Sequence, residues 1–405
     1  MRKITLSLVA ILSSYTTTYA QESDSINSAF DSGKIDAQIR VGYLYADPKI
    51  SNHPSPYATA IGGKLKYETS RVYGFALGAS FYTSHSISAL SGEESSGRYN
   101  DELSTIDGHY DLLAEVYLDY NYQDFQIRIG RQLIDTPYAD SDDIRMTPNT
   151  FEGVVARYSY SEIDLVAGYI TKWQGPDAGI YEFVDLLDSG DGIAMVGATY
   201  ESSTIESNLW YYYAPDIANV IYADAKYIHK ISDDSSISTA LQFANQSELD
   251  NSSIDATLYG AMAELEYSGF TLSIAYDKLL VDANREYFGG FGGGVGFVNM
   301  FEMTAGLFTF HQNATAWKGS IAYDLSTIGV DNLSISYDYG SYEGEIEHKA
   351  NEQNLILTYT PSDNWNLEIV YDHIEDVDKD IGEGINGASV DGSLDRVLVR
   401  LDYNF

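Results

Sequence analysis

The sequence contains no cysteine, few basic residues and no apolar run long enough for a membrane-spanning helix. Without cysteine, neither disulfide bonds nor thiolate metal ligands can contribute, so hydrogen bonding and burial must stabilise the fold. The 23 Lys and Arg residues against 60 Asp and Glu residues give a formal net charge of −37. This excess of acid argues against binding to nucleic acid or anionic lipid surfaces and favours cations as partners.

The first 20 residues have the order of features found in a secretory signal peptide. Arg2 and Lys3 precede an apolar segment at 4–12, and small and polar residues follow as far as Ala20. The apolar segment is too short to cross a bilayer, which needs roughly 20 apolar residues. We therefore predict a signal peptide at 1–20 that is cleaved after Ala20, and an exported chain with a formal charge of −39.

From residue 34 onward, the chain divides into segments in which apolar and polar side chains alternate. At the first of them, Ile39 and Val41 are apolar and Arg40 between them is basic. The same pattern recurs at 125–129, 270–277 and 396–405. A period of two excludes a helix and is typical of barrel strands with lipid on one side and water on the other. The 35 tyrosines suit the lipid headgroup region, because the ring is apolar and its tip is polar.

Connections between these segments alternate between short turns, such as Ser268-Gly269, and long polar loops. Outer-membrane barrels have this asymmetry, with tight periplasmic turns and long outer loops. Placing both chain ends on the periplasmic side predicts an all-β, 18-stranded antiparallel barrel over 34–405, after a short periplasmic leader at 21–33. The run 303–310 could be read as one more strand, but an odd total would put Phe405 on the wrong side.

Two stretches, and a weaker third in the leader, carry motifs of a known family. The residues are Gly130-Arg131-Gln132, Asp143, Arg145, Pro148 and Thr150-Phe151-Glu152-Gly153; then Tyr323-Asp324-Leu325, Gly329 and Leu333 within 317–340; and Ala29-Phe30 with Gly33-Lys34. On these residues the chain resembles the OprD-type outer-membrane porins, including the major porins of campylobacter-like bacteria. The resemblance implies an 18-stranded barrel, a third loop that folds inward, and often a homotrimer.

Channels of this family that prefer carboxylate solutes have a ladder of basic side chains along one wall of the pore. In this sequence the inward-facing parity offers Arg40, Lys64, Lys66, Arg128, Arg157, Arg396 and Arg400. The first, second and last strands become neighbours when the barrel closes, so their basic residues would form one wall. A substrate-selective channel for small carboxylates or amino acids is therefore one alternative function.

The third loop, at 134–150, is acidic and is predicted to form the constriction of the pore. Its candidate residues are Asp135, Asp140, Asp142, Asp143 and Arg145. Opposite charges across a narrow gap create a transverse field that selects solutes by size, charge and dipole. Alternatively, these carboxylates accept hydrogen bonds from the loop backbone and serve only to fold it.

The proposed outer loops together carry a formal charge of −23, more than half of the −39 of the exported chain. Acidic rings at a narrow mouth would concentrate cations and bias ion entry. The alternative is a solvated surface that faces lipopolysaccharide and is bridged to it by divalent cations. Both interpretations make cations and outer-membrane lipid the expected partners, and neither involves nucleic acid.

Asp376, Asp378 and Asp380 form a DxDxD run in which alternate carboxylates could bind Ca²⁺. The EF-hand pattern then fails, because Ile381 stands where Gly is required and Gly387 stands where a bidentate Glu is required. A solvated acidic loop is the alternative. The sequence offers no other cofactor or metal candidate.

Motifs of catalysis are absent from the sequence. No GxSxG motif occurs, and the seven histidines are scattered without metal-ligand spacing. The glycine-rich tract at 289–296 matches no phosphate-binding motif and indicates a flexible loop. We therefore expect no catalytic residues and predict a passive, cation-preferring porin for small hydrophilic solutes and ions. A non-conducting adhesin or receptor barrel is the alternative from another class.

Overall fold

The computed structural model describes residues 22–50, 53–300, 311–383 and 389–405. The predicted signal peptide and the run 303–310 lie outside these residues, so the structure does not test them. Within the described ranges the α-helical structure is α1 (Ile26–Asp31), with short 3-10 helices η1 (Ser88–Leu90), η2 (Glu94–Ser96) and η3 (Leu325–Ile328). No helix of this described part has the length and apolar character needed to span a membrane.

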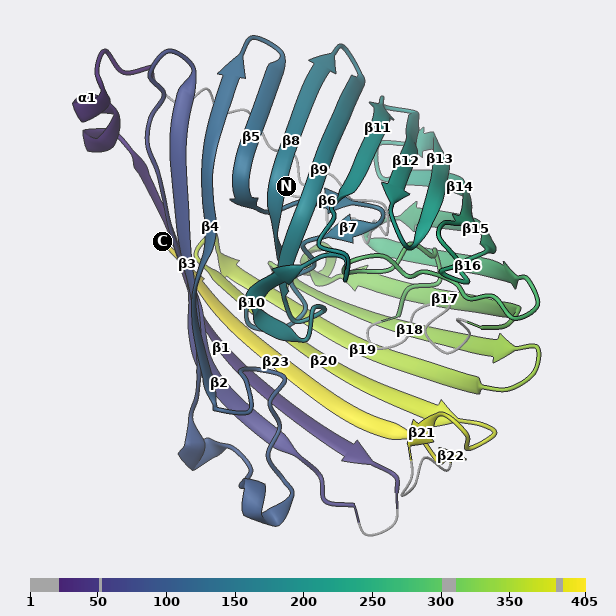
Figure 1. The fold of residues 1–405 in the computed structure, drawn as a ribbon. Coiled ribbons are helices and arrows are strands. Elements are labelled where there is room, and N and C mark those ends of the chain that lie inside the picture. Colours follow the sequence, from purple (N-terminus) through teal and green to yellow (C-terminus); the bar gives the residue numbers. More distant parts are fainter. Residues whose placement is uncertain (1–21, 51–52, 301–310, 384–388) are drawn as a thin grey trace.

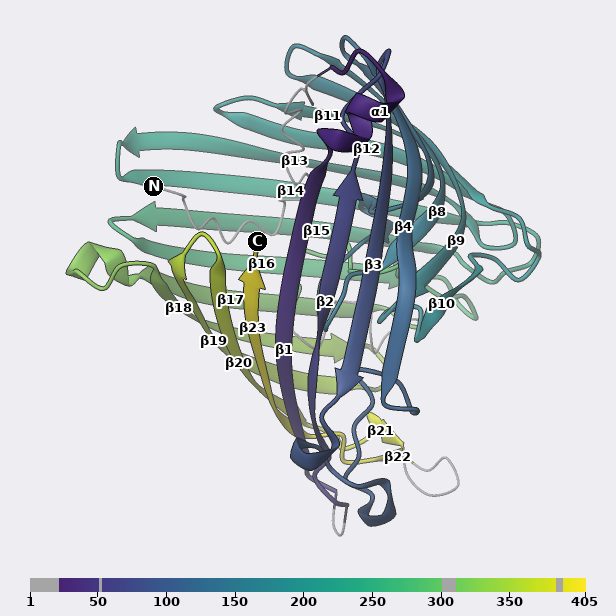
Figure 2. The ribbon, with the colours of Figure 1, turned by 90° about the vertical axis from the view of Figure 1, so that its left-hand side faces the viewer.

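Eighteen antiparallel strands form one closed β-barrel, which confirms the predicted fold class (Figure 1). They are β1 (Lys34–Pro48), β2 (Tyr57–Glu68), β3 (Phe75–Ser86), β4 (His109–Tyr122), β5 (Phe125–Gln132), β8 (Thr150–Tyr160), β9 (Ile163–Gly175), β11 (Ile193–Glu201), β12 (Ile205–Ala214), β13 (Ala218–Ser232), β14 (Ser235–Glu248), β15 (Ala256–Tyr267), β16 (Phe270–Val281), β17 (Ala314–Asp324), β18 (Leu333–Gly344), β19 (Lys349–Ser362), β20 (Trp365–Asp376) and β23 (Leu394–Asn404). Each strand pairs with its neighbours in the chain, and the last strand returns to the first (Figure 2). At this β1–β23 seam, Arg40 lies opposite Asp402.

Shorter strands lie in or beside the loops. β10 (Ile180–Asp185) pairs with β9 and so extends the barrel sheet beyond the eighteen strands. Two small hairpins are formed by β6 (Asp135–Thr136) with β7 (Ala139–Asp140), and by β21 (Gly382–Glu383) with β22 (Ser389–Val390).

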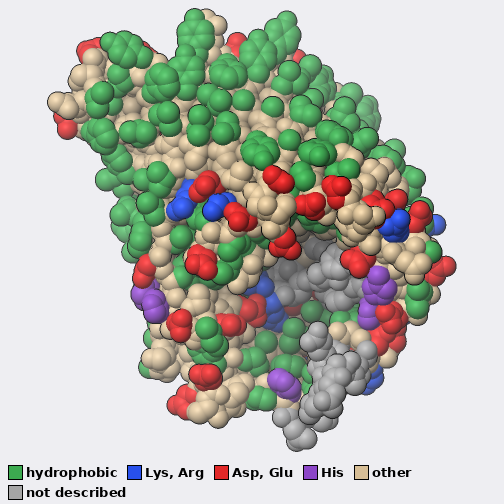
Figure 3. Space-filling view, viewed as in Figure 1, with side chains coloured by type: hydrophobic (Ala, Val, Ile, Leu, Met, Phe, Trp, Pro, Cys, Tyr) green, Lys and Arg blue, Asp and Glu red, His purple; other side chains and the backbone are tan. Residues whose placement is uncertain are grey.

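The alternation along each strand sets the two faces of the wall. Ile39 and Ile274 point outward and are 46 % and 59 % exposed, whereas Arg40 and Asp119 point inward and are 3 % and 0 % exposed. Hydrophobic side chains accordingly cover the outer surface of the wall in the space-filling view (Figure 3). Such an outer face suits lipid, and the polar inner face suits a lumen that contains water.

Short turns, α1 and the C-terminal end of β23 lie at one end of the barrel (Figures 1 and 2). Two-residue turns between antiparallel strands need left-handed backbone, and Gln123 (φ 53°) and Ser268 (φ 48°) supply it. The leader is tied to the same end, since the carbonyl oxygen of Ala29 in α1 accepts a hydrogen bond from the backbone N–H of Ser70 at 3.1 Å. The helix inside the predicted leader was not anticipated from the sequence.

The third loop, which occupies residues 133–149 in the structure, folds into the barrel. Its Tyr138 is 1 % exposed and packs against the rings of Tyr212 and Tyr222 on β12 and β13. On the other side, Asp143 in the same loop contacts Arg40 on β1. The loop therefore crosses the interior from one wall to the other, as its inward fold was expected to do.

The seventh loop runs from 282 to 313, and its described part also enters the barrel. Phe291 joins the third loop in a short parallel bridge, in which the N–H of Phe291 donates to Tyr138 at 3.0 Å and its carbonyl oxygen accepts from Asp140 at 3.0 Å. Gly292 (φ +85°) lies so close that a Cβ there would be 2.3 Å from the carbonyl oxygen of Asp140. Close packing against the third loop thus explains the glycine at position 292. The sequence alone had indicated a flexible loop here.

Candidate functional site

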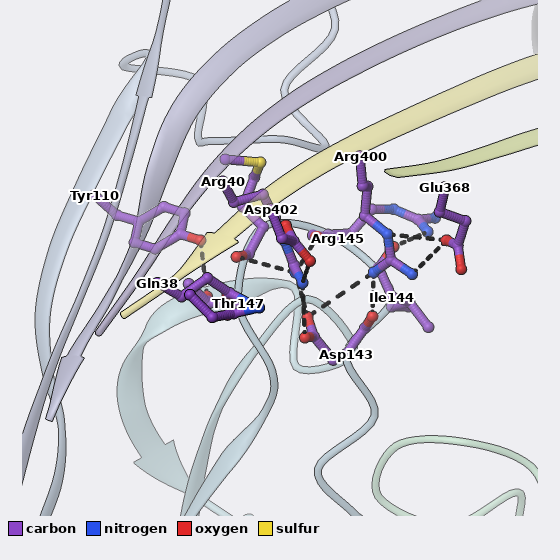
Figure 4. A network of polar contacts seen from close by, with 12 residues as sticks. Gln38, Arg40, Tyr110, Asp143, Ile144, Arg145, Thr147, Glu368, Arg400 and Asp402 are labelled. Carbon is purple, nitrogen blue, oxygen red and sulfur yellow. Dashed lines mark hydrogen bonds and ion pairs between the residues drawn. The ribbon is translucent and has the colours of Figure 1, made fainter. Parts of the chain in front are cut away.

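The third loop meets the barrel wall at Arg40, a buried residue of β1. Its Nε donates to Asp402 Oδ1 on β23 at 2.7 Å, and its Nη1 donates to Asp143 Oδ1 on the third loop at 2.6 Å (Figure 4). Nη1 also donates to the backbone carbonyl oxygen of Arg145 at 2.9 Å. Two carboxylates from different elements therefore balance one buried guanidinium and attach the loop to the β1–β23 seam.

A second arginine, Arg400 of β23, holds the same turn of the loop. Its Nη2 donates to Glu368 Oε1 on β20 at 2.6 Å, and its Nη1 donates to the backbone carbonyl oxygen of Asp143. Burial raises the pKa of the Asp143 carboxyl, but the charges of Arg40 and Arg400 and the hydrogen bonds from Arg40 outweigh burial, so that this pKa is lowered overall. Asp143 is therefore an anion held between two cations.

A third contact involves Glu102 from the second loop, which the sequence analysis had not singled out. Arg145 Nη2 lies 3.0 Å and Arg396 Nη2 lies 2.5 Å from the same oxygen, Oε2. Burial acts to raise the pKa of Glu102, but the charges of Arg396 and Arg145, with hydrogen bonds from Asn100 and Arg145, lower it overall. Arg145 thus lies on the side of the third loop that contacts arginines of the barrel wall, and it shares the counter-ion Glu102 with Arg396 of that wall.

The other carboxylates of the loop have different surroundings. The pKa of Asp140 is raised to about 7 by burial and by the charges of Asp135, Asp142 and Asp177. Burial and the charges of Asp177 and Asp143 likewise raise the pKa of Asp142 to about 6. Asp177 comes from the loop between β9 and β11 and accepts a hydrogen bond from Asn149 Nδ2 at 2.5 Å. These residues form an acidic group beside the arginine contacts.

The remaining basic residues predicted for the wall lie on β2, β5 and β8. Lys66 pairs with Glu115 at 2.9 Å, and Arg128 pairs with Asp119 at 3.0 Å. Two others are placed by strand pairing: Lys64 on β2 lies opposite Gln38, and Arg157 on β8 lies opposite Gln126. The charge of Lys64 adds to the lowering of the Asp143 pKa.

Inward-facing acids are the candidate site residues that sequence reasoning missed. Asp402, Glu368 and Asp119 occupy the same strand faces as the predicted basic residues and pair with them. The alternation that selected the basic residues would also have found these acids, had both signs of charge been sought. Glu102 and Asp177 lie in loops, where no such periodicity exists.

A family model described as outer membrane porin, OprD family, matches residues 70–369. The chain belongs to the OprD family of porins. Its fold is similar to three solved structures, each less than 20 % identical: OpdK of Pseudomonas aeruginosa with vanillate (18 % identity, 93 % of this chain and 99 % of that chain, TM-score 0.75), OccAB2 of Acinetobacter baumannii (18 %, 93 % and 99 %, 0.76) and a BenF-like porin of Pseudomonas fluorescens (15 %, 93 % and 100 %, 0.78). No curated protein sequence matches the chain significantly.

Membership of this family confirms the predicted location, the bacterial outer membrane, where the barrel crosses the membrane many times. It also makes the protein a member of a group of channels for small molecules that contact membrane lipid. The short turns therefore face the periplasm and the long loops face outward. The similarity to campylobacterial porins stays a prediction.

The porin's DxDxD run lies in the ninth loop, after β20. Oxygen atoms of Asp376, Asp378 and Asp380 lie within 4.8 Å of one another. Each carboxylate also accepts a backbone hydrogen bond, such as that from Lys349 to Asp378 at 2.8 Å. The three residues are thus brought together and help to fold the loop, and calcium binding stays a prediction.

Proposed function

We propose that this OprD-family porin is a passive, cation-preferring channel for small hydrophilic solutes and ions. The observation that carries the proposal is an acidic surplus inside the barrel. Among the described residues, ten acidic and four basic side chains are buried: Glu115, Asp119, Asp224, Glu264, Asp277, Asp338, Glu352, Asp372, Asp376 and Asp402 against Arg40, Lys226, Lys318 and Arg396. In a low-dielectric wall, such a surplus attracts cations and repels anions.

The arginines near the third loop do not reverse this balance, because each has carboxylate partners. Arg40 contacts two of them, Arg400 contacts Glu368, and Arg145 and Arg396 share Glu102. Paired charges of opposite sign largely cancel at the distance of a passing ion. Asp140 and Asp142 add negative charge on the other side of the loop. The net field along the path therefore favours cations.

A second candidate is a channel selective for small carboxylates or amino acids. Arg40, Arg145, Arg396 and Arg400 all lie around the third loop, and the similar OpdK structure was solved with vanillate, an aromatic carboxylate. A solute carboxylate could bind here by replacing Asp143 or Glu102 as the partner of an arginine. Such exchange of one carboxylate for another would make a specific but reversible site.

A planar-bilayer measurement separates these functions. In a KCl gradient, the purified porin should give a reversal potential of the sign expected for K⁺ preference, because the acidic surplus excludes Cl⁻. Anion preference would contradict the proposal. Block of the KCl current by vanillate, weakened by Arg400→Gln, would favour the second candidate, and absence of conductance would favour an adhesin or receptor.

Two further parts of the proposal concern chemistry and assembly. A diffusion channel needs no covalent step and no cofactor, so we infer no enzymatic activity. The resemblance to the family makes a homotrimer the expected assembly. Measurement of the native mass of the protein in detergent tests this expectation. A monomeric mass would contradict that expectation and leave the channel proposal unaffected.

A further inference from the structure

A second group of polar residues lies at the outer mouth, away from the third loop. It contains His311 at the end of the seventh loop, and Glu347 and His348 in the turn between β18 and β19. Glu347 Oε1 lies 3.0 Å from His311 Nε2 and 3.7 Å from His348 Nε2. All three atoms lie within 4.8 Å of one another. Histidine side chains are visible among acidic ones at the rim of the hollow in Figure 3.

These spacings match the ligand set of a small transition-metal ion. Zinc bonds to imidazole nitrogen and carboxylate oxygen are about 2.0–2.2 Å long, so ligands of a tetrahedral ion lie roughly 3.3 Å apart. The two measured distances fall on either side of that value. Two histidines and one glutamate leave the fourth position open to water, as in known three-ligand zinc sites.

A carboxylate outside the group lies beside the ring of His348. Asp380 of the ninth loop accepts from the backbone N–H of His348 at 3.2 Å, and its Oδ1 lies 3.1 Å from His348 Nδ1. This contact leaves Nε2 turned toward Glu347. Metal-binding histidines commonly have such a carboxylate on their other nitrogen, which fixes the tautomer and raises ligand basicity. His348 also has left-handed backbone (φ 68°), a conformation that costs free energy and here places the ring.

The two segments that supply the ligands are attached to each other by Gln312, which is 3 % exposed. Its Nε2 donates to the carbonyl oxygen of Glu347 at 2.9 Å, and its Oε1 accepts from the N–H of Ile346 at 2.6 Å. Because a buried amide rather than the ligands themselves holds the backbones together, the segments that carry the three ligands lie side by side before any ion arrives. This pre-organisation distinguishes the group from ordinary exposed His–Glu pairs, which contribute little to stability.

We infer that His311, Glu347 and His348 form a binding site for a divalent transition-metal cation of the zinc type at the outer mouth of the porin. Imidazole nitrogen selects such ions over Ca²⁺ and Mg²⁺, which prefer oxygen ligands. The acidic outer loops raise the local concentration of cations. A bound ion would link the ends of the seventh and eighth loops, and Asp380 would connect the ninth loop to them. The inference does not depend on the ion preference proposed above.

The test uses the full exported chain in detergent micelles, without a polyhistidine tag and stripped of metal by a chelator. Titration with ZnCl₂ in a calorimeter should give one Zn²⁺ per chain. His311→Ala and His348→Asn should each weaken binding at least about tenfold, and Asp380→Asn roughly tenfold to a hundredfold, as for other residues that orient metal ligands. Asn is chosen at position 348 because it tolerates left-handed backbone.

His373→Ala is the matched control. His373 also contacts a carboxylate, with Nδ1 lying 2.6 Å from Asp395, but it lies outside the group and its loss should leave Zn²⁺ affinity unchanged. Single-channel conductance of each variant verifies that the barrel is folded. No Zn²⁺ binding by the wild-type porin, or binding that survives His311→Ala with His348→Asn, would overturn the inference. Displacement of Zn²⁺ by a roughly hundredfold excess of Ca²⁺ would also overturn it, because oxygen ligands would then hold the ion.

Discussion

The third loop has a basic side and an acidic side, and carboxylates only one to three residues apart differ in their charge state. Asp143 lies between Arg40 and Arg400; partial burial acts to raise its pKa, and the two arginines lower it overall. Asp140 and Asp142 lie among other carboxylates, and their pKa values are raised to about 7 and about 6. The difference shows that a run of aspartates is not one electrostatic unit. Which wall each carboxylate faces decides its charge at neutral pH.

The largest expected effect comes from removing the central cation of the basic side. Arg40→Met would leave Asp143 and Asp402 without their shared guanidinium, and breaking a buried ion pair costs about 3–5 kcal/mol. Unfolding of the porin in urea should show a loss of that size. Arg131→Met is the matched control, because the Arg131–Glu152 pair is about one-third exposed and should contribute less than about 1 kcal/mol. Equal losses in the two variants would show that the buried pairs do not hold the third loop.

The acidic side is covered by the seventh loop, so Gly292→Ala should loosen that side alone. A Cβ at 292 would lie 2.3 Å from the carbonyl oxygen of Asp140, and the loops would have to separate. Gly179→Ala has a similar left-handed backbone (φ +66°) with nothing within 4 Å of the added atom, which makes it the control. Both variants should lose about 1–2 kcal/mol from backbone strain, and Gly292→Ala should lose more. The same loss in both, measured by urea unfolding, would contradict close packing between the two loops.

Removal of charge from the acidic side should change ion preference. A unit charge about 6 Å from a passing ion contributes about 0.7 kcal/mol in water, with opposite sign for K⁺ and Cl⁻, so its loss changes the K⁺/Cl⁻ permeability ratio roughly tenfold. Asp140→Asn with Asp142→Asn removes two such charges at pH 8, where both residues are ionised, and should lower the ratio by at least about tenfold. Asp143→Asn is the comparison, because it removes a negative charge and also leaves the Arg40 guanidinium with one carboxylate partner instead of two. An unchanged ratio in both variants would remove the third loop from its proposed role.

The smallest expected effect is a pH dependence that belongs to the acidic side. Because the pKa values of Asp140 and Asp142 are about 7 and about 6, these residues lose negative charge as the pH falls from 8 to 5. K⁺ preference should therefore fall over this range, while Asp143, whose pKa is lowered, stays ionised. Reversal potentials at several pH values measure this. Persistence of the same pH dependence in the Asp140→Asn, Asp142→Asn variant would assign it to other groups.

Much of the architecture follows from local pattern. The two-residue alternation of strands such as β1 and β16 is visible in any ten residues, because lipid and water act on opposite faces of the same strand. It yields the number of strands, the direction of Arg40 and Ile274, and the neighbours at the β1–β23 seam. The inward third loop came from the resemblance to a family, not from alternation. The helix α1 in the leader, six residues long, has no comparable repeat.

Long-range contacts account for what the sequence did not show. The glycine-rich sequence predicts a flexible seventh loop, whereas its Phe291 and Val295 are buried and Phe291 pairs with the third loop. The group of His311, Glu347 and His348 has no pattern in the sequence, since His311 and His348 are 37 positions apart in the chain. A contact between loops has no period that a sequence could reveal.

The sequence alone therefore determined the barrel, its two faces and the acidity of its loops, because each of these properties depends on residue type at fixed local spacing. Tertiary structure decided which carboxylates are paired. Asp402 reaches Arg40 across 362 residues of chain, and Asp143 reaches it from the third loop, 103 residues away. Charge interactions depend on distance in space and on burial. Both arise only when the barrel closes and its loops fold inward.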